Sequence, residues 1–306
     1  MPENSRQSAQ ALHYEVHSHL RDAGLSRAAR LTHGYLVRRC YDLDVTTTPI
    51  PIRERWGKVP EATLVFWVIK IFATTLGETG GDAVTMSLNL GYAVGTAIFA
   101  ALFIVTVTAQ IRAQTFHRAL FWTVIVATTT VGTTLADLVD RSLGIGYVGG
   151  SLLLIGLLLA TLALWYRTCG SVALSSIGSP REEVFYWATI LFSQTLGTAL
   201  GDWTADSDGG GLGFGYEKGA LLFAAGLALV AAAYYFTKLS RTALFWAAFV
   251  LTRPLGATVG DLLDKPRESG GFELSRYTAS AVLAGVIILA VAFLPQRPEP
   301  LRVQPD

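Results

Sequence analysis

The sequence predicts an all-α polytopic membrane protein with eight transmembrane helices, arranged as four parallel two-helix repeats. Three observations support this fold class. Of the 306 residues, 51% are hydrophobic and only 15% are charged, whereas about 25% of the residues in a soluble chain are charged. Eight stretches are apolar over about 20 residues, the length that crosses a bilayer as a helix. Finally, Trp, Gly and Asp recur four times at fixed offsets, which indicates an internal repeat.

Composition also excludes several classes of protein. Thirty glycines and 11 prolines are ordinary for this length, and two cysteines cannot build a disulfide scaffold. The net charge of +1 gives no sign of nucleic-acid binding. Strict alternation of apolar and polar residues is absent from the apolar stretches, so we expect helices rather than strands of a barrel. The lipid bilayer is therefore the first expected partner.

The eight spans follow each other closely along the chain. The first begins too late to be the apolar region of a secretory signal peptide. We expect spans at about residues 60–81, 88–110, 119–139, 144–166, 183–202, 215–236, 242–262 and 276–294.

Lys and Arg are distributed unevenly around these spans. Residues 1–58 form a polar segment with nine of the 24 Lys and Arg residues. If this segment is cytosolic, 17 Lys and Arg residues lie inside and five lie outside, as the positive-inside rule favours. We therefore predict a cytosolic N-terminal segment (1–58), a membrane domain (59–295) and a cytosolic tail (296–306). The membrane domain divides into repeats at 59–112, 113–168, 180–238 and 240–295.

Each repeat carries the same spaced residues on its first span. A Trp near the start is followed ten residues later by a Gly and fifteen residues later by an Asp. A Tyr then opens the second span. The four sets are Trp67, Gly77, Asp82 and Tyr92; Trp122, Gly132, Asp137 and Tyr147; Trp187, Gly197, Asp202 and Tyr216; and Trp246, Gly256, Asp261 and Tyr277.

These units resemble a bacterial family of membrane-anchored proteins with four tandem two-span repeats, each with a Trp, of unknown function. The similarity is carried by Lys58-Val59-Pro60-Glu61, by Phe66-Trp67, and by the run Thr74-Thr75-Leu76-Gly77-Glu78-Thr79-Gly80-Gly81-Asp82. It covers about residues 57–295. The resemblance implies a bacterial inner membrane and supplies no activity, so the chemistry has to be argued from the residues.

A polar stripe follows one face of each odd-numbered span. At 100° per residue, the Trp and the positions 7, 11 and 15 residues after it fall within an arc of about 80°. Such a stripe has to face protein or water rather than lipid. Its polar members, with the flanking threonines, are Thr74, Thr75, Glu78 and Asp82; Thr129, Thr130, Thr133 and Asp137; Gln194, Thr195, Thr198 and Asp202; and Arg253 and Asp261.

The stripes offer oxygen ligands, which Mg²⁺ and Mn²⁺ prefer over the softer metals. We expect Asp82, Asp137, Asp202, Asp261 and Glu78 to bind a metal ion between the odd-numbered helices. Five acids against two bases give a formal charge near −3. The two bases are Lys70 and Arg253, which pair with the acids or control gating or coupling. We expect the substrate path to be lined by Thr74, Thr75, Thr129, Thr133, Gln194, Thr198, Lys70 and Arg253.

The sequence therefore predicts an inner-membrane transport protein for a small cation, multi-pass, with both termini cytoplasmic. No nucleophile–base pair is evident, so we expect neither an enzyme nor a resident cofactor. The alternative is a membrane scaffold or sensor that acts through residues 1–58 without transport. Import, export and a homo-oligomer are left open.

The remaining features have simpler explanations. We expect the Trp and Gly sets to serve mainly helix packing. His13, His17 and His19 more often form a solvated helix face than a metal site. The loop Asp206-Ser207-Asp208-Gly209 resembles a calcium loop but lacks the later Glu that one requires.

Overall fold

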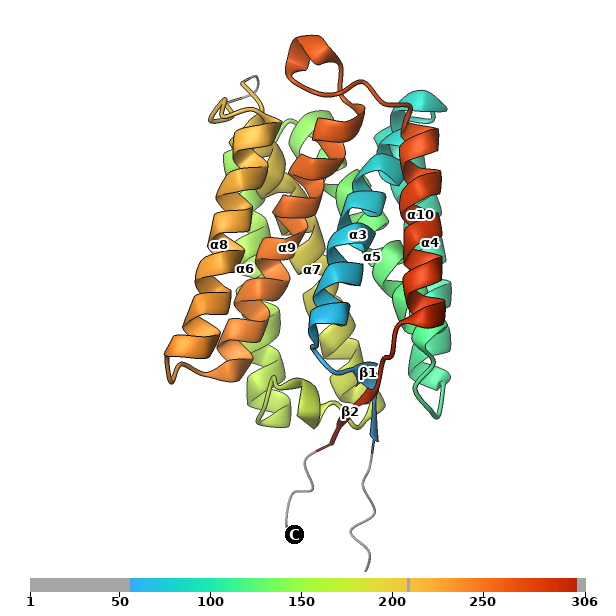
Figure 1. Cartoon of the computed structure of the whole chain (residues 1–306), viewed down its shortest axis with the longest axis vertical. Helices are drawn as coiled ribbons and strands as arrows, with labels where there is room; N and C mark the ends of the chain where they lie inside the picture. Colours follow the sequence, from blue (N-terminus) through green and yellow to red (C-terminus); the bar gives the residue numbers. More distant parts are fainter. Residues whose placement is uncertain (1–55, 208–209, 302–306) are drawn as a thin grey trace, which may run out of the picture. The chain divides into compact units, whose positions relative to one another are not determined.

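The computed structural model describes residues 56–207 and 210–301, and this part of the chain is almost entirely helical (Figure 1). The segment 1–55, with the three expected tail histidines, lies outside the described residues, as do Asp208, Gly209 and 302–306. The helices are α3 (Leu64–Asp82), α4 (Gly91–Arg112), α5 (Arg118–Asp137), α6 (Gly146–Cys169), α7 (Pro180–Ala205), α8 (Tyr216–Phe236), α9 (Arg241–Asp264) and α10 (Arg276–Phe293).

Three of the odd-numbered helices begin at a capping side chain. Thr63 and Ser240 accept hydrogen bonds from backbone N–H groups in the first turns of α3 and α9. Ser179 and Glu182 form a capping box at the start of α7, where Pro180 occupies the first helical position. These caps satisfy N–H groups that have no partner within the helix. They fix where the first span of a repeat starts.

The helix ends differ between repeats. Helix α3 continues after Asp82 into the π-helical turn η1 (Ala83–Ser87), and α5 continues after Asp137 into η2 (Leu138–Ser142). Helices α7 and α9 instead run on as α-helix to Ala205 and Asp264. π-Helical turns are rare and occur frequently at functional sites.

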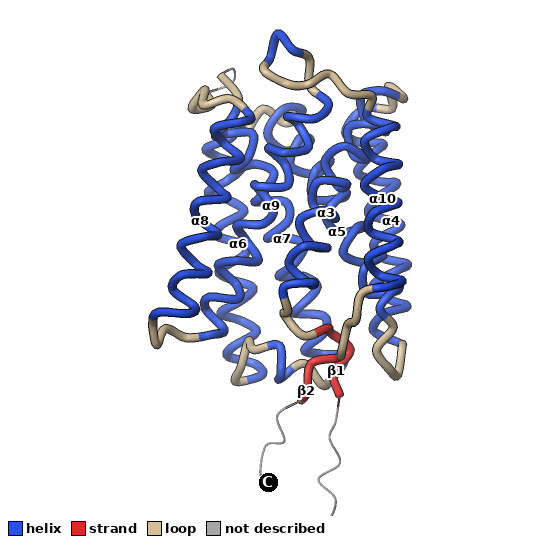
Figure 2. The backbone as a smooth tube through the Cα atoms, in the orientation of Figure 1, coloured by secondary structure: helices blue, strands red, loops and turns tan. Residues whose placement is uncertain are grey.

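The helices form two layers (Figure 2). Helices α3, α5, α7 and α9 form an inner ring, in which each packs against two neighbours and α9 closes against α3. Each outer helix packs mainly on the inner helix of the following repeat: α4 on α5, α6 on α7, and α8 on α9, while α10 returns to α3. The four repeats therefore interlock around the ring.

The recurring glycine is explained by this ring. In each repeat, the Gly ten residues after the Trp leaves room for a side chain of a neighbouring inner helix. That side chain belongs to the residue seven positions after the Trp of its own helix. A Cβ added at Gly77 would lie 2.6 Å from Thr129 Oγ1, and one added at Gly197 would lie 2.4 Å from Arg253 Cβ. The four contacts are Gly77 with Thr129, Gly132 with Gln194, Gly197 with Arg253, and Gly256 with Thr74.

Among the residues that the structure describes, six helices are long and apolar enough to cross a membrane: α4, α5, α6, α8, α9 and α10. The outer helices carry large apolar side chains on the surface, such as Val105 on α4, Leu152 on α6 and Leu229 on α8. Contiguous apolar surface of this kind is costly in water and favourable in lipid. The fold is compatible with a multi-pass membrane protein.

One short strand pair departs from the predicted spans. The sequence placed residue 60 at the start of the first span and residues 296–306 in a plain tail. In the structure, β1 (Trp56–Pro60) pairs antiparallel with β2 (Pro298–Pro300), and α3 starts only at Leu64. The Thr63 side chain caps α3 by accepting a hydrogen bond from the Phe66 N–H, which favours this later start. The strand pair brings the two ends of the described chain together.

Candidate cation site between the inner helices

An aromatic cluster fills the ring at the end where the strand pair lies. Trp122, Trp187 and Trp246 are buried there, and Trp67 is partly buried against the same cluster. Neighbouring rings meet edge to face, for example Tyr186 and Trp187 with centroids 5.0 Å apart. Offset and edge-to-face contacts are the arrangements that aromatic pairs prefer. This end of the ring is therefore filled by packed side chains.

Lys70 lies just beyond the aromatic cluster. Its Nζ atom donates to Thr252 Oγ1 at 2.6 Å and to the Phe249 carbonyl at 3.2 Å. It also lies 3.8 Å from the centre of the Phe249 ring. Within the described part of the chain, Lys70 forms no ion pair, so the expected pairing with an acid holds for Arg253 alone.

The next layer contains Arg253 and its carboxylate partner. Arg253 Nη2 donates to Glu78 Oε2 at 2.9 Å and also reaches the hydroxyl oxygens of Thr133 and Thr198. These four residues come from four different inner helices, and all are buried. A buried charged pair needs such additional hydrogen bonds to offset its lost hydration. Thr133 and Thr198 therefore lie where the sequence analysis placed polar lining.

The four repeated aspartates form two pairs, each bridged by a cation. Arg141 lies 3.1 Å from Asp137 and 3.2 Å from Asp202. Lys265 lies 2.7 Å from Asp82 and 3.1 Å from Asp261. Each cation follows an Asp by four residues, so one helical turn places it beside the Asp of its own repeat. The packing of the inner helices then brings it to the Asp of the next inner helix.

A further arginine, two further aspartates and two tyrosines surround these pairs at the acidic end of the ring. Arg276 lies 3.0 Å from Asp264 and 3.8 Å from Asp82. Asp206 accepts hydrogen bonds from the hydroxyls of Tyr147 and Tyr216, at 2.6 and 3.1 Å. Two of the four repeated tyrosines therefore act as donors to a single carboxylate at the rim of the ring.

Lys265 keeps its positive charge in this environment. Burial lowers the pKa of its ammonium, but the carboxylates of Asp261, Asp82 and Asp264 raise it, and the result is a pKa well above the ordinary value. The neighbouring carboxylates therefore favour the charged form of this side chain.

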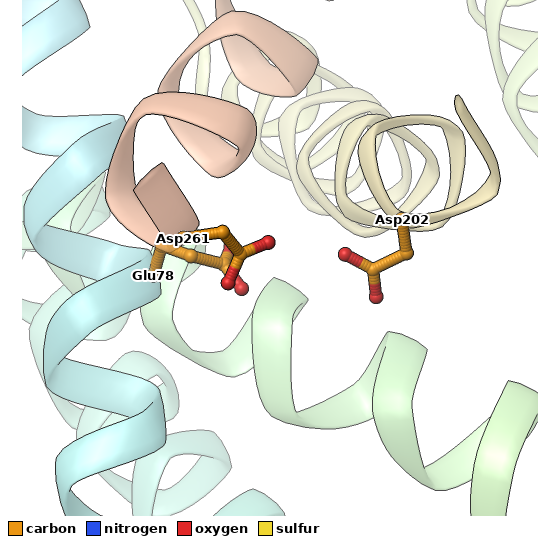
Figure 3. Close-up of side chains that lie close together, drawn as sticks. All are labelled: Glu78, Asp202 and Asp261. Carbon is orange, nitrogen blue, oxygen red and sulfur yellow. The ribbon is translucent and has the colours of Figure 1, made fainter. Parts of the chain in front are cut away.

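Three carboxylates from three inner helices meet beside these pairs. One carboxylate oxygen each from Glu78, Asp202 and Asp261 lies within 4.8 Å of the other two. Glu78 and Asp261 lie side by side, and Asp202 faces them from across the ring (Figure 3). A second group of the same size consists of Asp82, Asp261 and Asp264. Oxygen ligands bind Mg²⁺ at about 2.0–2.1 Å and Ca²⁺ at about 2.3–2.6 Å. Two ligands of one ion therefore lie at most about 4.2 Å apart for Mg²⁺ and about 5.2 Å apart for Ca²⁺, so oxygens within 4.8 Å of one another can share a Ca²⁺-sized ion as they stand and have to close slightly around Mg²⁺.

The formal charges leave this centre negative. Glu78 is paired with Arg253, and Asp264 is paired with Arg276. The four repeated aspartates and Asp206 share the two bridging cations, so acidic side chains outnumber the cations that contact them. The predicted surplus of acid is present. Of the cations that reduce it, Arg253 was expected, whereas Arg141, Lys265 and Arg276 were not.

Several predicted lining residues lie one level closer to the aromatic cluster. Thr74 donates to the carbonyls of Ile71 and Thr252, and Thr75 donates to the carbonyl of Ile71. Gln194 and Thr129 are fully buried. In the described residues, neither amide atom of Gln194 nor the hydroxyl of Thr129 has a hydrogen-bond partner.

Asp137 stands apart from both three-acid groups. It is buried and lies against Arg141, and no group of three potential ligands in the described part of the chain includes it. The structure therefore joins four of the five expected metal ligands into these groups and leaves Asp137 as an ion-pair partner.

The sequence analysis missed the cations that lie over the acids. It placed Arg141, Lys265 and Arg276 in outer loops, and it did not single out Asp264. The signal was present in two repeats, where a basic residue follows the Asp by four positions on the same helical face. The other two repeats carry Met86 and Asp206 at this position, so the repeat pattern hides it.

The ring of interlocking units defines a class of helical membrane protein built from internal repeats. The profile of the family described as Repeat of Unknown Function (DUF347) matches residues 65–116, 120–171, 185–240 and 244–296. The chain belongs to this family, and the resemblance seen in the sequence is confirmed. Neither a curated protein nor a solved structure matches the chain significantly.

Proposed function

We propose that the protein transports a small cation, with Mg²⁺ or Mn²⁺ as the expected substrate, through the centre of the inner ring. The observation that carries the proposal is the convergence of Glu78, Asp202 and Asp261 in the buried interior, where acidic side chains outnumber the cations that contact them. Uncompensated charge is expensive inside a membrane protein. A divalent cation would supply the missing charge through hard oxygen ligands.

The polar layer next to the acids supports a path along the ring axis. Thr129, Gln194 and Arg253 each have at least one buried polar atom without a hydrogen-bond partner in the described residues. Buried polar groups normally find a partner, and an ordered water or an ion serves when protein does not. We propose that these groups extend the path toward Lys70, and that Lys70 and Arg253 control its opening.

The proposed topology has eight spans. Helices α3 and α7 are less apolar than the other six because they carry charged residues, but both belong to the same inner ring. The glycine contacts join matching offsets on neighbouring inner helices, which supports four parallel repeats around an axis along the membrane normal. The distribution of Lys and Arg supports cytoplasmic termini, and the family resemblance suggests a bacterial inner membrane.

Reconstitution into liposomes tests the proposal. Protein in vesicles loaded with a Mn²⁺-sensitive dye should admit external Mn²⁺ faster than empty vesicles. Asp202→Asn should reduce this rate at least tenfold, because it removes one of the three converging carboxylates. Glu268→Gln is the matched control, because this acid lies on an exposed turn and has no contact with the ring.

Two results would contradict transport. Wild-type vesicles that admit no more Mn²⁺ or Mg²⁺ than empty ones would remove the proposal. Equal rates in the wild type and Asp202→Asn would separate any flux from the acidic centre. The first result would favour the scaffold or sensor alternative, in which the polar stripes only hold the helices together.

A further inference from the structure

We call Glu78, Asp202 and Asp261 the inner group of acids, and Asp82, Asp261 and Asp264 the outer group. The Lys265 side chain lies in the outer group. Its Nζ atom lies 2.7 Å from Asp82 Oδ2 and 3.1 Å from Asp261 Oδ1. The contact with Asp82 is also a hydrogen bond, whereas the contact with Asp261 is an ion pair alone. Asp261 belongs to both groups, so the ammonium lies beside a carboxylate that the inner group also uses.

The ammonium leaves the outer group incompletely satisfied. The Oδ1 atoms of Asp82, Asp261 and Asp264 are all buried, and none has a hydrogen-bond partner in residues 56–207 and 210–301. These three residues are at most 6% exposed, so bulk water does not replace the missing donors. Buried carboxylate oxygens without donors are costly, and an ion bound by all three residues would relieve that cost.

The two bridging cations of the ring differ in how firmly they are held. Arg141 contacts three carboxylates, those of Asp137, Asp202 and Asp206. Its planar guanidinium matches such a set with fixed donors, whereas a lysine is a point charge on a flexible stem. Lys265 also lies just after the end of α9, and its side chain is 11% exposed against 30% for Arg141, so the difference between the two cations lies in the flexible stem and the number of carboxylate contacts rather than in exposure.

We propose that Lys265 is a tethered competitor for a second divalent-cation site formed by Asp82, Asp261 and Asp264, and that an arriving ion displaces its ammonium. This inference rests on the proposed function. It adds a second cation site and a side chain that regulates binding there. The ammonium fills the site when no ion is bound, which limits its negative charge. Displacement moves a positive charge out of the ring as the ion enters.

Mn²⁺ binding to the purified full chain tests this inference. Electron paramagnetic resonance at low ionic strength would measure bound and free Mn²⁺ for the wild type and for Lys265→Gln. The variant should bind Mn²⁺ with a Kd at least tenfold lower, because the competing charge is gone. Lys265→Arg keeps the charge and should show no such gain in affinity. Arg267→Gln, an exposed residue of the same loop, is the matched control.

A second substitution separates the two sites. Asp264→Asn in the Lys265→Gln background should abolish the gain in affinity, because Asp264 belongs to the outer group alone. If the double variant keeps the gain in Mn²⁺ affinity, the extra binding takes place at the inner group, and the inference is overturned.

Amine labelling tests the same inference without substitution. A small water-soluble acylating reagent, followed by mass spectrometry, would report how accessible Lys265 is in the wild type. Mn²⁺ should raise its labelling several-fold and leave the exposed Lys218 and Lys238 unchanged. Labelling that falls or stays constant on Mn²⁺ binding would overturn the displacement.

The outcomes distinguish the two proposals. Mn²⁺ binding by the wild type with no gain in Lys265→Gln contradicts the competitor role and leaves the proposed function in place. Absence of Mn²⁺ binding in the wild type and in Lys265→Gln contradicts both a hard-cation substrate and the second site. A gain in Lys265→Gln that is lost with Asp264→Asn supports both.

Discussion

The two ends of the inner ring are built from the same four repeats, but they differ in how closely the repeats agree. At the aromatic end, every repeat supplies a Trp preceded by Phe or Tyr, and the side chains pack in one cluster. Toward the acidic end, the position seven residues after the Trp holds Thr74, Thr129, Gln194 or Arg253. Four arginines there would repel each other, whereas one can pair with Glu78 on the neighbouring inner helix.

This difference separates two kinds of position. Of the positions that repeat without change, the Trp and the Gly maintain the packing that a closed ring of similar units requires, and the Asp supplies one acid from each unit. Positions that break the repeat supply single charges, and these charges contact partners on other helices. Substitutions at the two ends should therefore differ in how much they lower the free energy of unfolding and in which second substitution restores it.

The largest effect is expected for Arg253→Met. Loss of the guanidinium leaves the buried Glu78 carboxylate without its cation and also removes the partner of Thr133 and Thr198. Breaking a buried pair costs about 3–5 kcal/mol. The free energy of unfolding, measured by titrating sodium dodecyl sulfate into mild detergent, should fall by this amount.

Recovery of that loss by a second substitution tests its cause. In Arg253→Met/Glu78→Gln no charge is left unpaired, so this variant should be more stable than Arg253→Met alone. If the two variants are equally stable, the cost comes from lost packing against Gly197 rather than from charge.

Helix existence and spacing could be predicted from the sequence because each span is an apolar stretch of bilayer length. The structure places helices within a few residues of most expected spans. The fixed Trp, Gly and Asp offsets also indicated one shared polar face. Residue 60 was expected to be helical, and no local pattern indicates its pairing with Pro298–Pro300, because that pairing depends on contacts distant in the chain.

The convergence of acids on one face could likewise be expected, but their pairing could not. Helical periodicity places Glu78 and Asp82 on one face, yet it does not say which neighbouring helix they meet. The order of the inner helices is a property of the closed ring. Only with that order known does Lys265 become a neighbour of Asp82, which is 183 residues away in sequence.

An intermediate effect is expected for Gly256→Ala. The added Cβ would lie 2.2 Å from Thr74 Oγ1, so α3 and α9 have to move apart. Overpacking of this kind costs about 1–3 kcal/mol. Gly285→Ala is the matched control, because a Cβ there meets nothing within 4 Å, and replacing a helical Gly by Ala gains about 0.5–1 kcal/mol.

A double-mutant cycle links this cost to the ring contact. Thr74→Gly should recover part of the stability lost in Gly256→Ala, because it removes the clashing side chain. If the two losses simply add, the helices do not approach each other at this pair, and the repeated glycine contact is not what closes the ring.

The smallest effect is expected at the aromatic end, for Gln296→Ala. Trp122 Nε1 donates to Gln296 Oε1 at 2.6 Å, which connects the indole to the segment that leads into β2. Gln296 is partly exposed, so water can replace it and the loss should be about 1 kcal/mol. The same unfolding titration would show this as a slight shift. A loss as large as that of Arg253→Met would mean that a single contact, rather than the repeated aromatic packing, stabilises this end.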